Sequence, residues 1–407
     1  MDSLPCGHVA HPAERRSCAH LPAAKSRSHY RQLTGTGMDH VLLCPACADG
    51  QEPLANVIEI CPGCLELIDE EFDDVLGWRG QPEIRLRDGE LTGAWTSRAC
   101  AAEPLNPRCL APLPDGWLAL TAEGLVHLGE SADRPVEARI ELPTEEPAEF
   151  RGRVRGPALH TSRDGHFAAV VTDYGRYGTV LDLRTGQVVL PLDRNEYHPE
   201  TTPFPFVFLD AGQVVAATDW CRLEVIDLGS GQSLAHHQLD YFRGALHRNP
   251  SGTRVADDGW VWGPVGSPRV LDVPAWLRGE EPDQRLSYRD HAWDQPVAWV
   301  DEDTVAVQRV GQLDWAMIDG VELYDARTAA RTGMFAGPAG PMWGFGGLLH
   351  VSASAGFELW DPAQGARIGL IEGFRPHAHN PVTGAFAELA DGVLRTLANI
   401  RSTPARP

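Results

Sequence analysis

The stretch TVLDLRTGQVVLPL, residues 179–192, contains the pattern that decides the fold. An alternating apolar segment ends in Asp182, a turn containing glycine follows, and a second apolar segment begins. Alternation with a period of two is typical of a half-buried β-strand, and aspartate followed by glycine favours a tight turn. The stretch therefore predicts two neighbouring antiparallel strands joined by a short turn.

The same pattern recurs along the chain. Its anchoring aspartates are Asp182, Asp227, Asp272, Asp325 and Asp361. Their successive spacings are 45, 45, 53 and 36 residues. A second pattern, a turn followed by a strand, precedes each of them, as in SRDGHFAAV at 162–170. A repeat of about 45 residues with about four strands is typical of one blade of a β-propeller. We therefore predict a mainly β chain that folds as a β-propeller.

Seven blades are predicted, and six or eight are the alternatives. Their approximate spans are 105–143, 159–194, 203–239, 244–279, 295–337, 341–373 and 375–400. The last span is one strand short, and the segment PEIRLRDGELTGAW at 82–95 precedes the first full blade. We expect this segment to complete the last blade, because a ring closed by both chain ends leaves no exposed sheet edge.

The repeats resemble those of WD-repeat proteins. LWDP at 359–362 is the nearest match, and the resemblance covers residues 81 to about 400. The motifs are degenerate, because no blade opens with the Gly-His pair of a full WD repeat. The resemblance implies a β-propeller fold and leaves the subfamily and the function of the blades open.

A cysteine cluster lies near the N-terminus, where CPACADGQEPLANVIEICPGC occupies 44–64. Cys44 and Cys47 form one Cys-x-x-Cys pair, and Cys61 and Cys64 form the other. Two such pairs predict a tetrahedral four-sulfur zinc site, with a sulfur-bound iron or a pair of disulfides as alternatives. Four thiolates leave no open coordination position, so the predicted role of the metal is structural.

Two upstream pairs have the form Cys-x-His, namely Cys6 with His8 and Cys18 with His20. Together with the two Cys-x-x-Cys pairs they offer eight ligands, enough for a second zinc ion. In a sequential order, the two Cys-x-His pairs share one ion and the two Cys-x-x-Cys pairs share the other. In an interleaved order, Cys6 and His8 join one Cys-x-x-Cys pair, and Cys18 and His20 join the other. The sequence does not decide between the two orders.

The order of these pairs loosely resembles the zinc fingers of ubiquitin-specific proteases. The matching stretches are CAHL at 18–21, CPAC at 44–47 and CPGC at 61–64. Those fingers need further Cys and His ligands downstream, and residues 65–99 contain none. The resemblance therefore implies a compact treble-clef or ribbon-type zinc finger and nothing about ubiquitin binding.

Four segments are expected along the chain. Residues 1–70 form the zinc-binding module, which contains few large apolar residues and would fold on its metal. Residues 71–80 are a linker at the end of a short amphipathic helix predicted from LELIDEEFDDVLG at 65–77. Residues 81–401 form the propeller, and residues 402–407 form a tail.

The net charge and the hydropathy of the chain exclude some classes of partner. The formal net charge is −21, which opposes binding to nucleic acid and to anionic membrane surfaces. No apolar run is long enough to span a membrane, and the first residues lack the apolar segment of a secretory signal, so we expect a cytoplasmic protein.

No recognisable catalytic motif is present, so we expect a non-catalytic scaffold that binds a protein partner. The alternatives are a propeller enzyme that acts on a small molecule and a redox- or metal-sensing protein that uses the cysteine cluster.

Three stretches offer polar groups that could form a site. HAHN at 377–380 is expected to be a solvated loop, and DYGRY at 173–177 a partner-binding loop or a packed hairpin tip. Asp257 and Asp258 are expected to lie in a turn.

Overall fold

The computed structural model describes residues 15–18, 20, 30–33, 40–44, 47, 57–60, 84–140, 142–210, 212–312, 314 and 317–403. Two compact units are present. The first comprises Met1–Glu83, Tyr288–His291 and Arg309–Ile318, and the second comprises the remaining residues. The helix expected at 65–77 lies outside the described residues.

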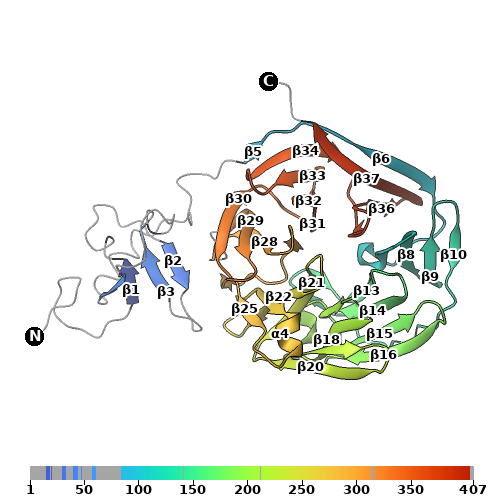
Figure 1. The fold of residues 1–407 in the computed structure, drawn as a ribbon, viewed down its shortest axis with the longest axis horizontal. Helices are drawn as coiled ribbons and strands as arrows, with labels where there is room; N and C mark the ends of the chain where they lie inside the picture. The colour runs from blue at the N-terminus through green and yellow to red at the C-terminus, as the bar shows by residue number, and fades with distance from the viewer. Residues whose placement is uncertain are drawn as a thin grey trace, which may run out of the picture. The chain divides into compact units, whose positions relative to one another are not determined.

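Seven antiparallel sheets form a ring in the second unit (Figure 1). The predicted seven-bladed β-propeller is therefore confirmed. The strands of the first three blades are β7 (Leu110–Leu113), β8 (Gly116–Thr121), β9 (Gly124–Leu128) and β10 (Asp133–Pro135); β13 (Gly156–Thr161), β14 (Phe167–Asp173), β15 (Tyr177–Asp182) and β16 (Gln187–Asp193); and β17 (Phe206–Phe208), β18 (Gln213–Asp219), β19 (Arg222–Asp227) and β20 (Gln232–Gln238).

The remaining blades follow the same order of strands. They contain β21 (Phe242–Arg248), β22 (Arg254–Val261), β24 (Arg269–Asp272) and β25 (Asp283–Arg285); β27 (Val297–Trp299), β28 (Thr304–Val310), β29 (Ile318–Asp325) and β30 (Arg331–Ala336); β31 (Met342–Phe345), β32 (Leu348–Ser352), β33 (Gly356–Asp361) and β34 (Ala366–Glu372); and β35 (Ala378–His379), β36 (Phe386–Ala390), β37 (Val393–Thr403) and β6 (Glu90–Ala99). Short elements between them are β5 (Arg85–Leu86), η2 (Pro107–Cys109), β11 (Glu149–Phe150), β12 (Arg153–Val154), η3 (Pro199–Thr201), β23 (Val265–Gly266), α4 (Val273–Leu277) and β26 (Arg289–Asp290).

The repeating aspartates end the third strands of the blades, as predicted. In blade two, the Asp182 carboxylate accepts hydrogen bonds from the backbone N–H groups of Arg184 and Thr185, at 2.8 and 3.1 Å. The same turn then places Gly186 at a φ of +69°, in the left-handed region that favours glycine. Equivalent bonds form at the corresponding aspartates of blades three, five and six. Each aspartate therefore closes the turn that leads to the outermost strand.

Blade four departs from this turn. Its Asp272 instead caps the short helix α4 by accepting a hydrogen bond from the backbone N–H of Ala275 at 2.8 Å. An aspartate at the N-cap satisfies one of the free N–H groups of the first helical turn. The insertion of α4 explains why the spacing from Asp272 to Asp325 is longer than the others.

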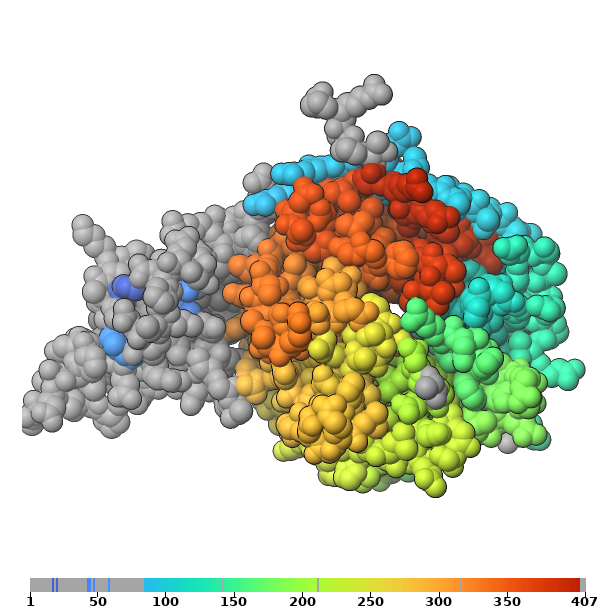
Figure 2. Space-filling view, viewed as in Figure 1, coloured from blue at the N-terminus to red at the C-terminus, as the bar shows by residue number. Residues whose placement is uncertain are grey.

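The core is divided among the interfaces between blades. Each of the seven pairs of neighbouring blades encloses its own cluster of buried apolar side chains. The cluster between blades two and three, for example, joins Val171 and Val180 to Phe206 and Phe208. Figure 2 shows the blades side by side around the ring, with consecutive colours in contact. Because each blade buries its faces only against its neighbours, every blade depends on an unbroken ring.

The ring is closed by strands from both ends of the propeller. β6 pairs antiparallel with β37 in nine register positions, from Glu90 opposite Thr403 to Ala99 opposite Val393. It therefore forms the outermost strand of blade seven, as Figure 1 shows at the rim of the ring. The predicted closing segment was 82–95, and the structure places the strand at Glu90–Ala99. β5, just before it, pairs parallel with β34 of blade six.

The N-terminal unit contains a four-stranded sheet in the order β2-β3-β1-β4. Its strands are β1 (Arg15–Cys18), β2 (Tyr30–Leu33), β3 (His40–Leu43) and β4 (Val57–Ile60). β1 runs parallel to β3 and antiparallel to β4. Ser17, Leu42 and Leu43 are buried in this unit.

Candidate functional site

A stack of aromatic rings is formed by two strands of blade four and two connections between blades. The rings belong to Tyr197, Phe242, Trp260 and Trp293, named here the aromatic column. Successive centroids are 5.8, 4.2 and 4.8 Å apart, and successive ring planes differ by 14°, 10° and 18°. Tyr197 is 43% exposed, whereas the other three rings are buried. The column thus presents one aromatic ring to solvent on a buried support.

Further aromatic side chains surround the solvent end of the column. Trp262 is 58% exposed and meets the Phe242 ring edge-on, with centroids 5.4 Å apart. Trp220 packs against the same ring at 4.7 Å, and His198 meets Trp262 at 5.7 Å. Such aromatic pairs contribute about 0.5–1.5 kcal/mol each beyond their buried area. The exposed rings are therefore held in place by several contacts. We call Tyr197, His198, Trp220 and Trp262 the aromatic rim.

The loop that carries Tyr197 is anchored on a buried arginine. The Arg194 guanidinium donates hydrogen bonds to the carbonyl oxygens of Gly175, Pro203 and Thr202, each at 2.8 Å. Burial lowers the pKa of Arg194 to about 10, so the side chain stays charged near neutral pH. Both column tryptophans reach the same loop through their indole N–H groups, which donate to the hydroxyl and the carbonyl of Thr201. The aromatic rim therefore rests on an ordered loop.

A buried ion pair joins two neighbouring strands of blade four, β21 and β22. Arg243, next to Phe242 in the chain, contacts the Asp257 carboxylate at 3.1 Å, and both side chains are 0% exposed. The backbone N–H of Gly244 donates to the other carboxylate oxygen at 2.8 Å. Burial raises the pKa of Asp257, and the Arg243 charge opposes that rise. The expected turn at Asp257 and Asp258 is wrong, because both residues lie in β22 and are buried.

Replacing Arg243 by methionine is expected to lower the free energy of unfolding by about 3–5 kcal/mol, because the buried Asp257 carboxylate loses its charge partner. Asn at position 257 keeps an acceptor for the Gly244 N–H but carries no charge. The double variant R243M/D257N should therefore be more stable than R243M alone. Urea unfolding followed by circular dichroism measures both. Equal stability of R243M and the unmodified protein would contradict the account.

A second polar network joins Tyr174, Arg153 and Asp294, which are distant in sequence. The Tyr174 hydroxyl donates to the Asp294 carboxylate at 2.7 Å, and Arg153 forms an ion pair with the same carboxylate. Burial raises the pKa of Asp294 to about 6, while the Arg153 charge opposes the rise. Asp173 accepts from Arg108 at 3.0 Å and from the backbone N–H of Phe204 at 2.9 Å. The DYGRY stretch is thus a packed hairpin tip, which is the second of the two alternatives predicted from the sequence.

In the HAHN stretch Ala378, His379 and Asn380 are buried and His377 is half-buried, so the expected solvated loop is wrong. His379 lies in β35 and stacks on Phe386 at 4.5 Å, while His350 stacks on the same ring at 4.8 Å. Burial lowers the pKa of His350 to about 4 and that of His379 to about 3. The Asn380 side chain donates to the Leu113 carbonyl at 3.0 Å and so joins blade seven to blade one. These residues support the ring and are not a solvated site.

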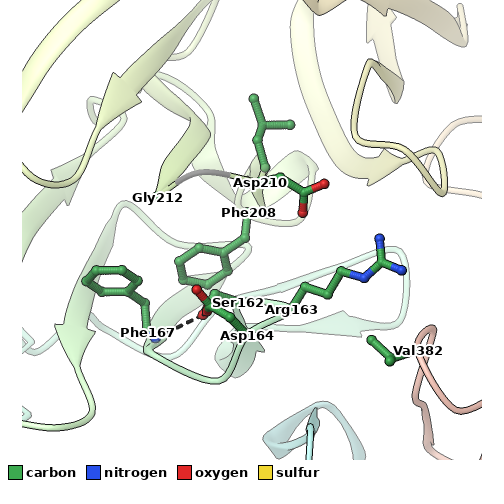
Figure 3. A pocket seen from close by; sticks show the side chains of 9 residues that line it. Ser162, Arg163, Asp164, Phe167, Phe208, Asp210, Gly212 and Val382 are labelled. Atoms are coloured by element: carbon green, nitrogen blue, oxygen red, sulfur yellow. Dashed lines mark hydrogen bonds between the residues drawn. The ribbon is translucent and has the colours of Figure 1, made fainter.

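A cavity of about 350 Å³ lies at the opposite ends of the blades, where the first and second strands turn. Its lining comes from blades two, three and seven: Ser162, Arg163, Asp164, Phe167, Phe208, Leu209, Asp210, Gly212 and Val382. Figure 3 shows Arg163 extending between these turns toward Val382. Arg163 donates to the Pro250 carbonyl at 3.2 Å, and Asp210 pairs with Arg248 at 2.9 Å. The charged groups of this cavity are therefore already partnered.

Three predicted zinc ligands come together in the N-terminal unit. The metal-binding atoms of His20, Cys44 and Cys47 all lie within 4.8 Å of one another. Neither Cys44 nor Cys47 is in a disulfide. The backbone of Cys18 ends β1. The other four predicted ligands, Cys6, His8, Cys61 and Cys64, lie outside the described residues.

Sequence reasoning missed the aromatic column. The signal was the stretch GWVWG at 259–263, in which Trp260 lies near the end of β22 and Trp262 directly follows that strand. The two rings meet edge-on, with centroids 5.1 Å apart. The other members, Tyr197, Phe242 and Trp293, are distant in sequence and carry no shared motif.

No helix in the described ranges is long and apolar enough to cross a membrane. No protein-family model matches the chain, and no curated protein matches it either.

Solved structures do match. The chain is similar to a chain of the crystal structure of the mitotic checkpoint complex, with 10% identity, a TM-score of 0.50, and coverage of 79% of this chain and 94% of that one. It is also similar to the WD40 domain of coronin from Toxoplasma gondii, with 11% identity, a TM-score of 0.52, and coverage of 78% and 89%. The structure of U3-55K gives 11% identity, a TM-score of 0.51, and coverage of 74% and 98%. At these identities the likeness shows the fold alone, which is that of a β-propeller.

Proposed function

We propose that this protein is a non-catalytic scaffold whose propeller binds a protein partner through the aromatic rim. The observation that carries the proposal is the exposure of Tyr197 and Trp262 above a buried stack of rings. Tyrosine and tryptophan are enriched among the residues that dominate protein–protein binding energy. Their support matters equally, because rings that are already ordered lose little conformational entropy on binding.

The similar structures support this proposal at the level of the fold. One of the similar chains belongs to the mitotic checkpoint complex, an assembly of proteins. A propeller suits such a role because its rigid blades hold loops at fixed positions.

The charge of the chain indicates the chemistry of the partner. With a formal net charge of −21, the surface as a whole repels anionic partners. A neutral or basic protein surface that presents apolar or cationic side chains to the exposed rings fits best, since arginine and lysine also bind aromatic faces. We expect neither nucleic acid nor membrane as the partner.

The test compares partner binding by variants of exposed apolar residues. Trp262→Ala and Tyr197→Ala remove the exposed rings, while Leu234→Ala is the control, since Leu234 is 45% exposed on the outer strand β20. Proteins that co-purify with the unmodified chain are identified, purified, and titrated against each variant. A hot-spot tryptophan contributes about 2 kcal/mol or more, so Trp262→Ala should weaken binding about 30-fold. Equal affinity of W262A and L234A would refute the proposal.

A further inference from the structure

We infer that the N-terminal unit binds one zinc ion through Cys18, His20, Cys44 and Cys47, so that a Cys-x-His pair and a Cys-x-x-Cys pair share the metal. This differs from the four-sulfur site predicted from the sequence. It is also independent of the proposed binding face on the propeller. The inference rests on the distances between the ligand atoms and on the register of the sheet that carries them.

The distances fit a tetrahedral zinc. His20 Nδ1 lies 3.3 Å from the Cys47 sulfur and 3.8 Å from the Cys44 sulfur. With Zn–S bonds of about 2.3 Å and a Zn–N bond of about 2.0–2.1 Å, a tetrahedral angle places sulfur and nitrogen about 3.6 Å apart. The two observed distances lie on either side of this value. Cys44 and Cys47 are both buried, as expected for ligands of a structural site.

The strand register brings the two pairs to the same edge of the sheet. β1 and β3 are parallel, and Ser17 lies opposite Leu42. Cys18 is the last residue of β1, and Cys44 directly follows the last residue of β3. Because parallel strands end at the same edge, the backbones of Cys18 and Cys44 lie at the same edge of the sheet. Cys18 is therefore the ligand that we assign to the fourth position.

The same register separates the second Cys-x-x-Cys pair from this edge. β4 is antiparallel to β1, with Cys18 opposite Val57 and Arg15 opposite Ile60. Ile60 immediately precedes Cys61, and three residues of strand separate it from the level of Cys18, about 10 Å at about 3.3 Å per residue. Two thiolates on one zinc lie about 4 Å apart. Ile60, the last residue of β4, thus lies at the edge opposite the one at which β3 ends, which disfavours a four-sulfur site shared by the two Cys-x-x-Cys pairs.

The donor set also favours zinc over the alternatives. Three thiolates and one imidazole are a common set for structural zinc, whereas the iron alternative considered above requires four thiolates. A set of four protein ligands leaves no coordination position for a substrate, so the metal stabilises the fold and does not catalyse. Apparent binding free energies of this kind of site are about 10–16 kcal/mol in small domains.

The first experiment measures zinc per chain on the purified full-length protein and on five variants. His20→Ala and Cys47→Ser should each lose one ion, and the two changes combined should lose that same single ion. Cys61→Ser should retain the ion that His20→Ala loses. If the unmodified protein holds two ions, the combination of Cys47→Ser with Cys61→Ser should lose both. If the unmodified protein holds two ions, loss of only one of them by this last variant would overturn the inference. Loss of an ion by Cys61→Ser and not by His20→Ala would overturn it as well.

The second experiment does not depend on the folding of any variant. The unmodified protein is loaded with cadmium-113, whose nuclear resonance reports the number of bound thiolates. The inference predicts a signal typical of three thiolates and one nitrogen. A signal typical of four thiolates, or the absence of bound metal, would contradict it.

Discussion

A chain that begins at Cys100 is expected to be insoluble or largely unfolded, whereas a chain that begins at Ile84 is expected to fold. The shorter chain lacks β6, which pairs with β37 in nine register positions and packs Trp95 against Phe374 at 4.9 Å. At about 1 kcal/mol per net hydrogen bond, its loss costs on the order of 5–10 kcal/mol, most of the stability of an ordinary domain. It also exposes β37 as an unpaired edge, which promotes aggregation.

The chain that begins at Ile84 is the matched control, because it lacks the same N-terminal segment but keeps the closing strand. Soluble yield and thermal unfolding followed by circular dichroism compare the two. Equal melting temperatures would mean that β6 does not close the ring. Trp95 offers a milder test of the same strand, since Trp95→Ala removes only the contact with Phe374.

Acidification from pH 7.5 to pH 4.5 is expected to destabilise the propeller strongly. Burial lowers the pKa of His247 and His350 to about 4 and that of His379 to about 3, from an ordinary value of 6.5. Between these values the unfolded chain binds protons that the folded chain does not, so stability rises with pH. It is fully present above about pH 6.5 and is lost as the pH falls toward 4. Each of these histidines then contributes a loss of about 3 kcal/mol.

His379→Leu isolates one of these histidines. The variant should lose about 2–3 kcal/mol less than the unmodified protein over the same pH range, because leucine binds no proton. His166→Leu is the control for the substitution itself, since the His166 side chain is 73% exposed. Urea unfolding at the two pH values gives the free energies. An identical pH slope for H379L and the unmodified protein would contradict a buried neutral His379.

Much of the fold could be predicted because its repeating unit is local. Asp182 and its equivalents bond to N–H groups two and three residues ahead, so the whole turn is contained in a few residues of sequence. The closing strand was expected eight residues too early at its start and four too early at its end. The alternation in ELTGAWTSRA at 90–99 continues past Trp95, and only the pairing with β37 fixes where it stops.

The aromatic rim and the buried polar groups could not be predicted in the same way. Asp257, Asp258 and the glycine after them have the composition of a turn, but Arg243 compensates the Asp257 charge from the neighbouring strand. The burial of His379 likewise depends on a neighbouring strand, because its ring stacks on that of Phe386. In each case the decisive partner is brought in by strand pairing, which local composition does not encode.

The candidate zinc ligands, in contrast, could be predicted from the sequence, but the ligands that share one ion could not. The sequence identified His20, Cys44 and Cys47 as ligand types at ligand spacings, and the structure brings these three together. Their grouping required the direction of the strands, because parallel β1 and β3 end at one edge while antiparallel β4 ends at the other. Short motifs therefore identify the ligand residues, whereas the choice of ligands that share one ion depends on how the strands pair.

The central claim is that a protein partner binds the aromatic rim of the propeller. Its most direct test places a photo-reactive amino acid at position 262 of the full-length protein in the cells that produce it, and the same group at position 234 as the control. After illumination, the account predicts a covalent complex with one defined protein from position 262 and none from position 234. No complex from position 262, or the same complexes from both positions, would contradict it.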